Sequence, residues 1–362
     1  MASAITRLVD YGQSPWYDNL TRALARGGLS TLVADHGIRG VTSNPTIFEK
    51  AMATGSDYDE QLRELVGAGA TTEEFYWGLV ERDIADAADI LAPHYRAWDG
   101  ADGFVSIEVD PDLAHDTERT LSQARDLFAR LGRNNLMIKI PATREGLPAI
   151  SAAIAAGLNV NITLIFGLDR YQEVIEAYLE GLEQRVASGE DVSGIASVAS
   201  FFVSRVDTET DRRLPDGHPL RGRAAVANAK LAYQVFRDRF SGPRWEDLTR
   251  AGARVQRPLW ASTSTKNPAY SPTLYVDELI GRDTVNTLAQ ASIDALAGHE
   301  GMQADSVTDD VAGAQTVIDG LAEAGVDFAD VTDTLEREGV DSFSASYHDA
   351  LDTLEKKARD IK

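Results

Sequence analysis

Cysteine is absent from the 362-residue chain, and aromatic residues make up only 7% of it. Without cysteine the chain can form no disulfide, no thiolate nucleophile, and no zinc or iron–sulfur site with cysteine ligands. No run of about 18 apolar residues occurs, and the N-terminal segment lacks the apolar core of a signal peptide. We therefore expect a cytoplasmic protein without membrane contact. The GxGxxG and Walker sequences of nucleotide-binding folds are also missing.

Positive charge is scarce as well. The chain has 35 lysine and arginine residues against 57 aspartates and glutamates, which gives a formal net charge of −22. A surface of this sign repels phosphate backbones, so we expect no nucleic-acid partner. An anionic ligand would need positive charge concentrated at one place in the fold. Only seven of the basic residues are lysines, so each lysine can be considered individually.

Short apolar runs alternate along the chain with longer amphipathic segments, which is typical of repeated strand–helix units around a parallel sheet. Eight such units predict an α/β protein with a single (β/α)₈ TIM barrel over residues 1–362. A doubly wound sheet is the alternative, and no glycine fingerprint supports it. The predicted strands are residues 14–18, 40–44, 103–109, 136–142, 159–166, 195–203, 255–262 and 284–288.

Three segments exceed what a minimal barrel needs. We predict a helical insertion over residues 50–98, a loop insertion over residues 207–223 and an acidic helical extension over residues 300–362. Thr71 and Glu74 form a capping-box pattern that predicts a helix start inside the first insertion. After residue 300 there are 15 acidic and 5 basic residues, yet apolar positions recur at helical spacing. We therefore expect packed helices with an acidic outer face.

Polar residues interrupt most of the predicted strands, and they do so near the C-terminal ends. Strands of a parallel barrel are apolar on both faces, so each buried polar residue needs a reason. The C-terminal ends of such strands meet at one mouth, where active sites form. Any one of these residues alone could have a purely structural role, but their shared position predicts a site. They are Asp18, Asn44, Glu108, Lys139, Asn161 with Thr163, Ser200 and Ser262.

Lys139 is the only lysine inside an apolar run. Burial disfavours an ammonium ion, and a neutral amine can form a Schiff base with a carbonyl substrate. Asp18 and Glu108 lie on other strands and could exchange protons with the intermediates. The alternative is structural: Lys139 would form an ion pair with Glu108 or Asp18, and both carboxylates would neutralise Lys139 and Arg205. The residues of this strand alone do not separate the two interpretations.

Two cations follow neighbouring strands and could bind an anion. Arg205 comes just after strand six, and Lys266 follows the hydroxyl-rich segment at residues 262–265. Hydroxyls, backbone N–H groups and cations together predict a phosphate site. A salt bridge from Arg205 to Asp207 or Glu209 is the structural alternative. The six histidines lie outside the predicted strands in no ligand spacing, so we predict no metal site.

Six segments in chain order resemble motifs of the transaldolase family. This resemblance extends over about residues 14–288 and includes the family's Schiff-base lysine strand at residues 137–143. The segments are residues 14–20 (SPWYDNL), 40–48 (GVTSNPTIF), 105–109 (VSIEV), 137–143 (MIKIPAT), 159–164 (NVNITL) and 200–205 (SFFVSR). The family is a (β/α)₈ barrel with that lysine on strand four, in agreement with the strand prediction.

The resemblance implies a reaction and a role for each matching residue. Lys139 would form an imine with a ketose phosphate, Asp18 would act as general acid–base in carbon–carbon cleavage, and Glu108 would move protons through a water held with Thr163. No cofactor is implied. The substrates would be sedoheptulose 7-phosphate or fructose 6-phosphate and an aldose phosphate, in the non-oxidative pentose phosphate pathway. The implied substrate-binding residues are Asn44, Asn161, Ser200, Phe202, Arg205, Ser262 and Lys266.

One departure from the family pattern concerns the phosphate site. Shorter members have an arginine at the position of Ser264, and Lys266 is the candidate to replace its charge. The nearest alternative activity is a fructose-6-phosphate aldolase that releases free dihydroxyacetone. That branch has glutamine at the position of Glu108 and tyrosine at the position of Phe202, so both residues here favour transfer. A phosphosugar isomerase and a sugar-phosphate-binding barrel without turnover are further alternatives. The sequence leaves a monomer and a homodimer both open.

Overall fold

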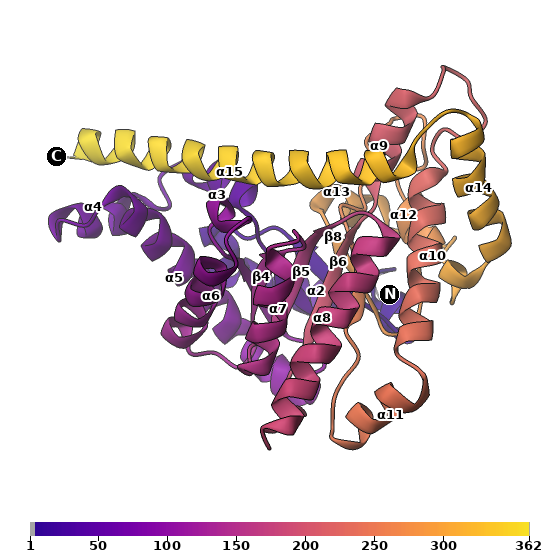
Figure 1. Cartoon of the computed structure of the whole chain (residues 1–362). Helices are drawn as coiled ribbons and strands as arrows, with labels where there is room; N and C mark the ends of the chain where they lie inside the picture. The colour runs from indigo at the N-terminus through magenta and orange to yellow at the C-terminus, as the bar shows by residue number, and fades with distance from the viewer. Residues whose placement is uncertain (1–3, 362) are drawn as a thin grey trace.

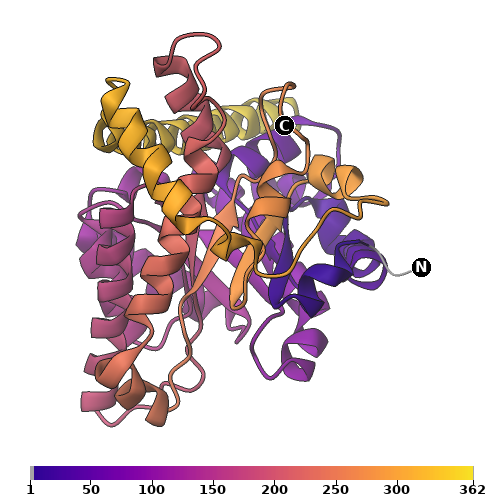
Figure 2. The same cartoon turned by 90° about the vertical axis from the view of Figure 1, so that its right-hand side faces the viewer.

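The computed structural model describes residues 4–361, so residues 1–3 and 362 of the predicted domain lie outside the described part. Eight parallel strands form a closed barrel in chain order, with helices around it (Figures 1 and 2). The predicted (β/α)₈ barrel is confirmed. Its strands are β1 (Gln13–Asp18), β2 (Gly40–Thr42), β3 (Phe104–Glu108), β4 (Leu136–Pro141), β5 (Val160–Ile165), β6 (Ser197–Phe202), β7 (Arg257–Ala261) and β8 (Thr284–Leu288).

The register of the strands places three of the predicted site residues in one layer. Glu108 on β3 pairs with Lys139 on β4, and Lys139 pairs in turn with Asn161 on β5. Every residue of these three strands is buried, as expected for a parallel sheet covered on both faces. Asn44 and Ser262 were predicted inside strands, but β2 ends at Thr42 and β7 at Ala261. Both residues therefore lie on the loops that surround the mouth.

Helices surround the outside of the barrel. The first and the last element of the described chain are also helices. The capping box predicted at Thr71 is present and begins a long helix between β2 and β3. The helices are α1 (Thr6–Asp10), α2 (Leu29–His36), α3 (Pro45–Ala53), α4 (Asp59–Gly67), α5 (Thr72–Ala97), α6 (Thr117–Leu131), α7 (Gly146–Ala155), α8 (Leu168–Ala187), α9 (Ser204–Arg213), α10 (Ala224–Arg239), α11 (Gly242–Arg250), α12 (Leu274–Glu278), α13 (Gln290–Ala295), α14 (Val311–Glu323) and α15 (Phe328–Ile361). Short turns of π- or 3₁₀-helix are η1 (Leu24–Gly28), η2 (Pro111–Leu113) and η3 (Ser306–Thr308).

The predicted loop at residues 207–223 is wrong over its first part, because α9 continues to Arg213. This segment is rich in charged residues, and such a composition is typical of a loop. In the fold, however, Glu209 pairs with both Arg212 and Arg213 at helical spacing. Such pairs stabilise a helix whose other face, including Val206 and Thr210, is buried. Residues 214–223 form the actual connection to α10.

The C-terminal helix α15 crosses the C-terminal end of the barrel instead of lying beside it. It is drawn in yellow along the upper side of the molecule in Figure 1. It packs against α3 and α9, which begin directly after β2 and β6, and it also contacts β5. Among residues 4–361 no helix is both long and apolar enough to span a lipid bilayer. The acidic extension thus becomes part of the wall around the mouth.

Candidate active site

A cavity of about 80 Å³ lies at the mouth of the barrel, among the C-terminal ends of the strands. Eight of the eleven predicted site residues line it: Asp18, Asn44, Lys139, Thr163, Ser200, Phe202, Arg205 and Ser262. Glu108 and Asn161 lie directly behind this lining, where they contact Lys139 and Ser200. Lys266 lines a neighbouring cavity.

Lys139 and Glu108 form a buried ion pair within the barrel. The Lys139 Nζ atom lies 3.0 Å from Glu108 Oε2 and donates a second hydrogen bond, also 3.0 Å, to the Ser43 carbonyl oxygen. Burial raises the pKa of Glu108, and the Lys139 cation opposes that rise. The predicted ion pair therefore exists, and it does not exclude catalysis. A carboxyl with a raised pKa in contact with an amine is well placed to exchange a proton with it.

Thr163 faces the cavity from β5 with an unsatisfied hydroxyl. Its Oγ1 atom is buried and has no hydrogen-bond partner among residues 4–361. Leaving a buried polar atom unpaired costs free energy, so such an atom in a cavity wall indicates a place for a polar ligand or water. This hydroxyl fits the water-holding role that the sequence resemblance implies for Thr163.

Asn161 is fixed by its neighbours on both sides. Its Nδ2 atom donates to Ser106 Oγ at 3.0 Å, and its Oδ1 atom accepts a 2.7 Å hydrogen bond from Ser200 Oγ. Asn161 is fully buried, whereas Ser200 also lines the cavity. The geometry therefore makes Asn161 the residue that orients Ser200.

Asp18 and Asn44 lie on the opposite side of the mouth, at the ends of β1 and β2. Asp18 Oδ1 accepts a 2.8 Å hydrogen bond from Thr42 Oγ1, which fixes the carboxylate at the cavity wall. Asn44 is the N-cap of α3, and its Oδ1 atom accepts from the backbone N–H of Ile47 at 3.0 Å. Since the cap uses only the oxygen, the amide nitrogen of Asn44 is available as a donor to a ligand.

Arg205 is the cation of the cavity. Its guanidinium lies over the rings of Phe202 at 5.0 Å and Phe343 at 5.9 Å, and burial lowers its pKa. Among residues 4–361 no carboxylate forms an ion pair with it. The alternative salt bridge to Asp207 or Glu209 is therefore wrong.

Both of those carboxylates have other partners. Asp207 accepts hydrogen bonds from Tyr275 Oη and the Ala225 N–H, both at 2.8 Å, and Glu209 pairs with the arginines that follow it on α9. Arg205 is thus a half-buried cation whose charge is available to a ligand. A phosphate or carboxylate ligand would supply the missing partner.

Lys266 belongs to the adjoining surface. It lines a cavity of about 370 Å³ together with Asp211 and Tyr270, and its pKa is lowered by burial and then by the charge of Arg205. The two cations therefore act on each other without sharing one cavity. The Ser264 hydroxyl forms a hydrogen bond with the Ser292 hydroxyl, with 2.9 Å between the two Oγ atoms.

Sequence reasoning missed Phe343, which reaches the cavity from α15 and is 3% exposed. Its only signal was an apolar residue at helical spacing in the acidic extension. Thr42 and Thr287 also line the cavity and were not predicted. The spacing of apolar residues shows that a helix is packed, but not which end of the barrel it covers.

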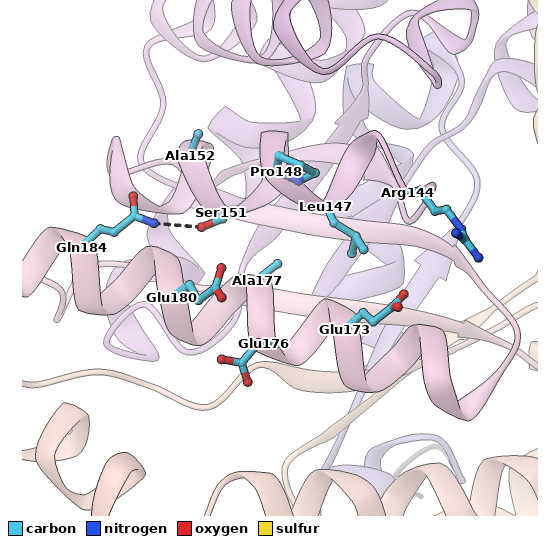
Figure 3. A pocket seen from close by; sticks show the side chains of 10 residues that line it. All are labelled: Arg144, Leu147, Pro148, Ser151, Ala152, Glu173, Glu176, Ala177, Glu180 and Gln184. Atoms are coloured by element: carbon cyan, nitrogen blue, oxygen red, sulfur yellow. Dashed lines mark hydrogen bonds between the residues drawn. The ribbon is translucent and has the colours of Figure 1, made fainter.

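A larger groove of about 590 Å³ lies on the outer surface, between α7 and α8 (Figure 3). Glu173, Glu176 and Glu180 line it from α8, with the Glu176 carboxylate turned away from α7, and a 3.3 Å hydrogen bond joins Gln184 to Ser151 across it. Glu176 is already paired with Arg239 and Arg244. The groove contains no lysine, and the converging polar residues of the mouth make the smaller cavity the better candidate.

The chain is similar to known proteins over almost its whole length. The family described as transaldolase/fructose-6-phosphate aldolase matches residues 15–354. A protein of Saccharopolyspora erythraea named transaldolase is 50% identical over 364 residues, which cover 99% of each chain. One of Thermobifida fusca with the same name is 51% identical over 360 residues, 98% of each chain. A third, from Mycobacterium bovis, is 50% identical over 347 residues, 94% of this chain and 93% of the relative.

Proposed function

The chain belongs to the transaldolase/fructose-6-phosphate aldolase family of enzymes, and we propose that it transfers a dihydroxyacetone unit between sugar phosphates through a Schiff base on Lys139. Relatives named transaldolase, similar over almost the whole chain, support transaldolase activity. The donors are sedoheptulose 7-phosphate or fructose 6-phosphate. The acceptors are glyceraldehyde 3-phosphate or erythrose 4-phosphate, which places the reaction in the non-oxidative pentose phosphate pathway.

Lys139 is the nucleophile of this mechanism. Its Nζ atom gives a proton to Glu108, 3.0 Å away, and attacks the C2 carbonyl carbon of the donor. Water leaves the resulting carbinolamine, and a protonated imine remains. The positive nitrogen then withdraws electrons from the neighbouring carbon–carbon bond. Glu108 and Thr163 hold the water that carries protons during these steps, and the unpaired Thr163 hydroxyl supports this role.

Asp18 carries out the cleavage and the transfer. Its carboxylate takes the proton of the C4 hydroxyl, the C3–C4 bond breaks, and the bonding electrons move to the imine to give an enamine. The aldose phosphate leaves, and the acceptor aldehyde takes its place. The enamine carbon attacks the acceptor carbonyl while Asp18 returns the proton to the new hydroxyl. Hydrolysis of the imine then releases the product and restores the Lys139 amine.

The remaining residues bind and orient the substrate. The Asn44 amide and the Ser200 hydroxyl hold the hydroxyls of the dihydroxyacetone unit, and Asn161 fixes Ser200. Arg205 binds the phosphate as a charge partner, with Ser262 beside it. Lys266 adds positive potential from the adjoining cavity. In this way a chain with a net charge of −22 holds an anionic substrate.

One observation carries the proposal: a buried lysine and a half-buried arginine that forms no ion pair among residues 4–361 line the same cavity at the mouth of the barrel. A Schiff-base enzyme needs the first, and a phosphorylated ketose needs the second. The experiment incubates the purified chain with fructose 6-phosphate and erythrose 4-phosphate and measures sedoheptulose 7-phosphate. We expect its formation to require both substrates. Absence of sedoheptulose 7-phosphate would contradict transfer.

The same assay separates transfer from the second candidate, an aldolase that releases free dihydroxyacetone. Glu108 and Phe202 support transfer, since the aldolase branch has glutamine and tyrosine at these positions. Phenylalanine provides no hydroxyl to position a water, so the intermediate should await an acceptor. Dihydroxyacetone that accumulates from fructose 6-phosphate alone, at the rate of the transfer reaction, would favour the aldolase.

A further inference from the structure

Phe343 is the one residue of the cavity wall that does not come from a strand or from the segment directly after one. It lies near the middle of α15, and its ring centroid is 5.9 Å from Lys139 Nζ and 5.9 Å from Arg205 Cζ. The side chain is 3% exposed. A phenyl ring from the C-terminal helix therefore packs against both the Lys139 amine and the Arg205 guanidinium.

The position of this ring is fixed by contacts on both sides of it along α15. Each contact joins the helix to a different segment that follows a strand, so the helix is held across the mouth (Figure 1). The partners are Thr46 with Ser346 at 2.7 Å, Asp112 with Ser344 at 2.5 Å, Arg170 with Glu336 at 3.2 Å and Arg213 with Asp330 at 2.6 Å.

Water is the competitor that this ring could exclude. After cleavage, the enamine on Lys139 can react with an acceptor aldehyde, or it can take a proton on its terminal carbon and become an imine again. If water then adds to the imine carbon, the nitrogen takes a proton and the C–N bond breaks. The products are free dihydroxyacetone and the Lys139 amine. This path needs only water, so its rate depends on how well the site is closed.

We propose that Phe343 determines how often the intermediate is transferred and how often it is released, by covering Lys139 so that water does not reach the imine before the acceptor does. This inference rests on the proposed Schiff-base function. Phe202 lies over Arg205 from within the barrel, at 5.0 Å, whereas Phe343 packs against both Arg205 and Lys139. Phe343 is thus a specificity-determining residue contributed by the C-terminal helix.

The test compares three substitutions at one position. Phe343→Leu, Phe343→Val and Phe343→Ala leave progressively more room for water above Lys139. Each full-length variant is given fructose 6-phosphate with and without erythrose 4-phosphate, and free dihydroxyacetone and sedoheptulose 7-phosphate are measured. We expect the ratio of release to transfer to rise in that order, by about tenfold for alanine. Three variants keep the trend measurable even if the alanine protein does not fold.

Tyr347→Ala is the matched control, because Tyr347 is buried one turn further along α15 and its ring packs 4.8 Å from that of Tyr76. It does not line the cavity. We expect it to keep the wild-type ratio even if it destabilises the helix. A ratio that stays constant across the Phe343 variants, or that rises equally in Tyr347→Ala, would overturn the role of Phe343. Failure of the wild-type chain to transfer at all would instead overturn the proposed function.

Discussion

At the N-terminal end of the barrel, a buried carboxylate has a full set of partners. Asp102 is 2% exposed and accepts hydrogen bonds from Ser14 at 2.5 Å, Trp16 at 3.0 Å and Arg257 at 3.1 Å. Arg39 lies 3.6 Å away as a second cation. These partners come from strands and loops far apart in the sequence, so the cluster ties together the end of the barrel opposite the mouth.

At the C-terminal end, the polar groups at the mouth are incompletely paired. Glu108 has one cation, Thr163 has a buried hydroxyl oxygen without a partner in the described chain, and Arg205 forms no ion pair with any residue of 4–361. Taking polar groups out of water costs free energy at both ends. The difference agrees with a stabilising role for the first cluster and with the proposed substrate-binding role for the second.

Loss of Lys139 should abolish the transfer activity that we propose for the cavity at the mouth. Lys139→Met removes the proposed nucleophile, so we expect transfer activity to fall by about 10⁴-fold or more. The control is Lys230→Met, at the other buried lysine, which is 6% exposed and paired with Glu278 on the outside of the barrel. Steady-state rates check both. Equal loss of activity in the two variants would mean that Lys139 acts only through packing or charge.

Loss of Asp102 should lower the stability of the protein and leave its activity per folded molecule unchanged. Asp102→Ala leaves Arg257, whose side chain is only 16% exposed, without its carboxylate, and breaking such a pair costs up to about 3–5 kcal/mol of unfolding free energy. We expect urea denaturation to show this loss, while kcat per folded molecule stays at the wild-type value. A large loss of kcat in a protein that remains folded would show that the two ends are not separate in function.

Asp207 is a further buried carboxylate, and it forms no ion pair with a cation among residues 4–361. It therefore shows what burial does to a carboxylate that has hydrogen bonds only. Burial raises its pKa from 3.8 to about 6. The folded state therefore binds more protons than the unfolded state in that range, so stability falls as the pH rises through it. Across the whole titration the unfolding free energy falls by about 3 kcal/mol, since each unit of change in pKa corresponds to about 1.36 kcal/mol. Asp207→Asn should remove this part of the pH dependence.

Urea unfolding of the wild type and Asp207→Asn, repeated between pH 4 and pH 7, measures the effect. The difference in unfolding free energy between the two should move in favour of the variant as the pH rises from 3.8 to about 6, and become constant above it. Parallel profiles over this range would show that Asp207 titrates at its usual pKa.

Loss of Arg205, the proposed phosphate-binding residue, should have the smallest effect of these changes, and the effect should fall mainly on KM for a phosphorylated substrate. Arg205→Ala removes a charged hydrogen-bond donor to the phosphate, worth about 1.5–3 kcal/mol, so we expect KM for fructose 6-phosphate to rise by about 10- to 100-fold. The control is Arg212→Ala on the same helix, whose side chain is exposed and paired with Glu209. An unchanged KM in Arg205→Ala would remove Arg205 from the phosphate site.

The sequence predicted the parts of this molecule whose signals are local. Short apolar runs gave the eight strands, and polar residues near their ends gave most of the cavity wall. The ends of α9 and the path of α15 depend on packing between distant segments, which periodicity does not encode. For the same reason Phe343 was missed and Lys266 was expected in the main cavity, although it lines the adjoining one.

The most direct test of the nucleophile is borohydride reduction in the presence of fructose 6-phosphate, followed by mass mapping of the peptides. Borohydride converts an imine into a stable amine, so the carbon skeleton remains on the lysine that formed it. We predict a three-carbon adduct on Lys139 and none on Lys230, the other buried lysine. No adduct, or an adduct on Lys230 instead, would contradict the assignment of Lys139 as the Schiff-base residue.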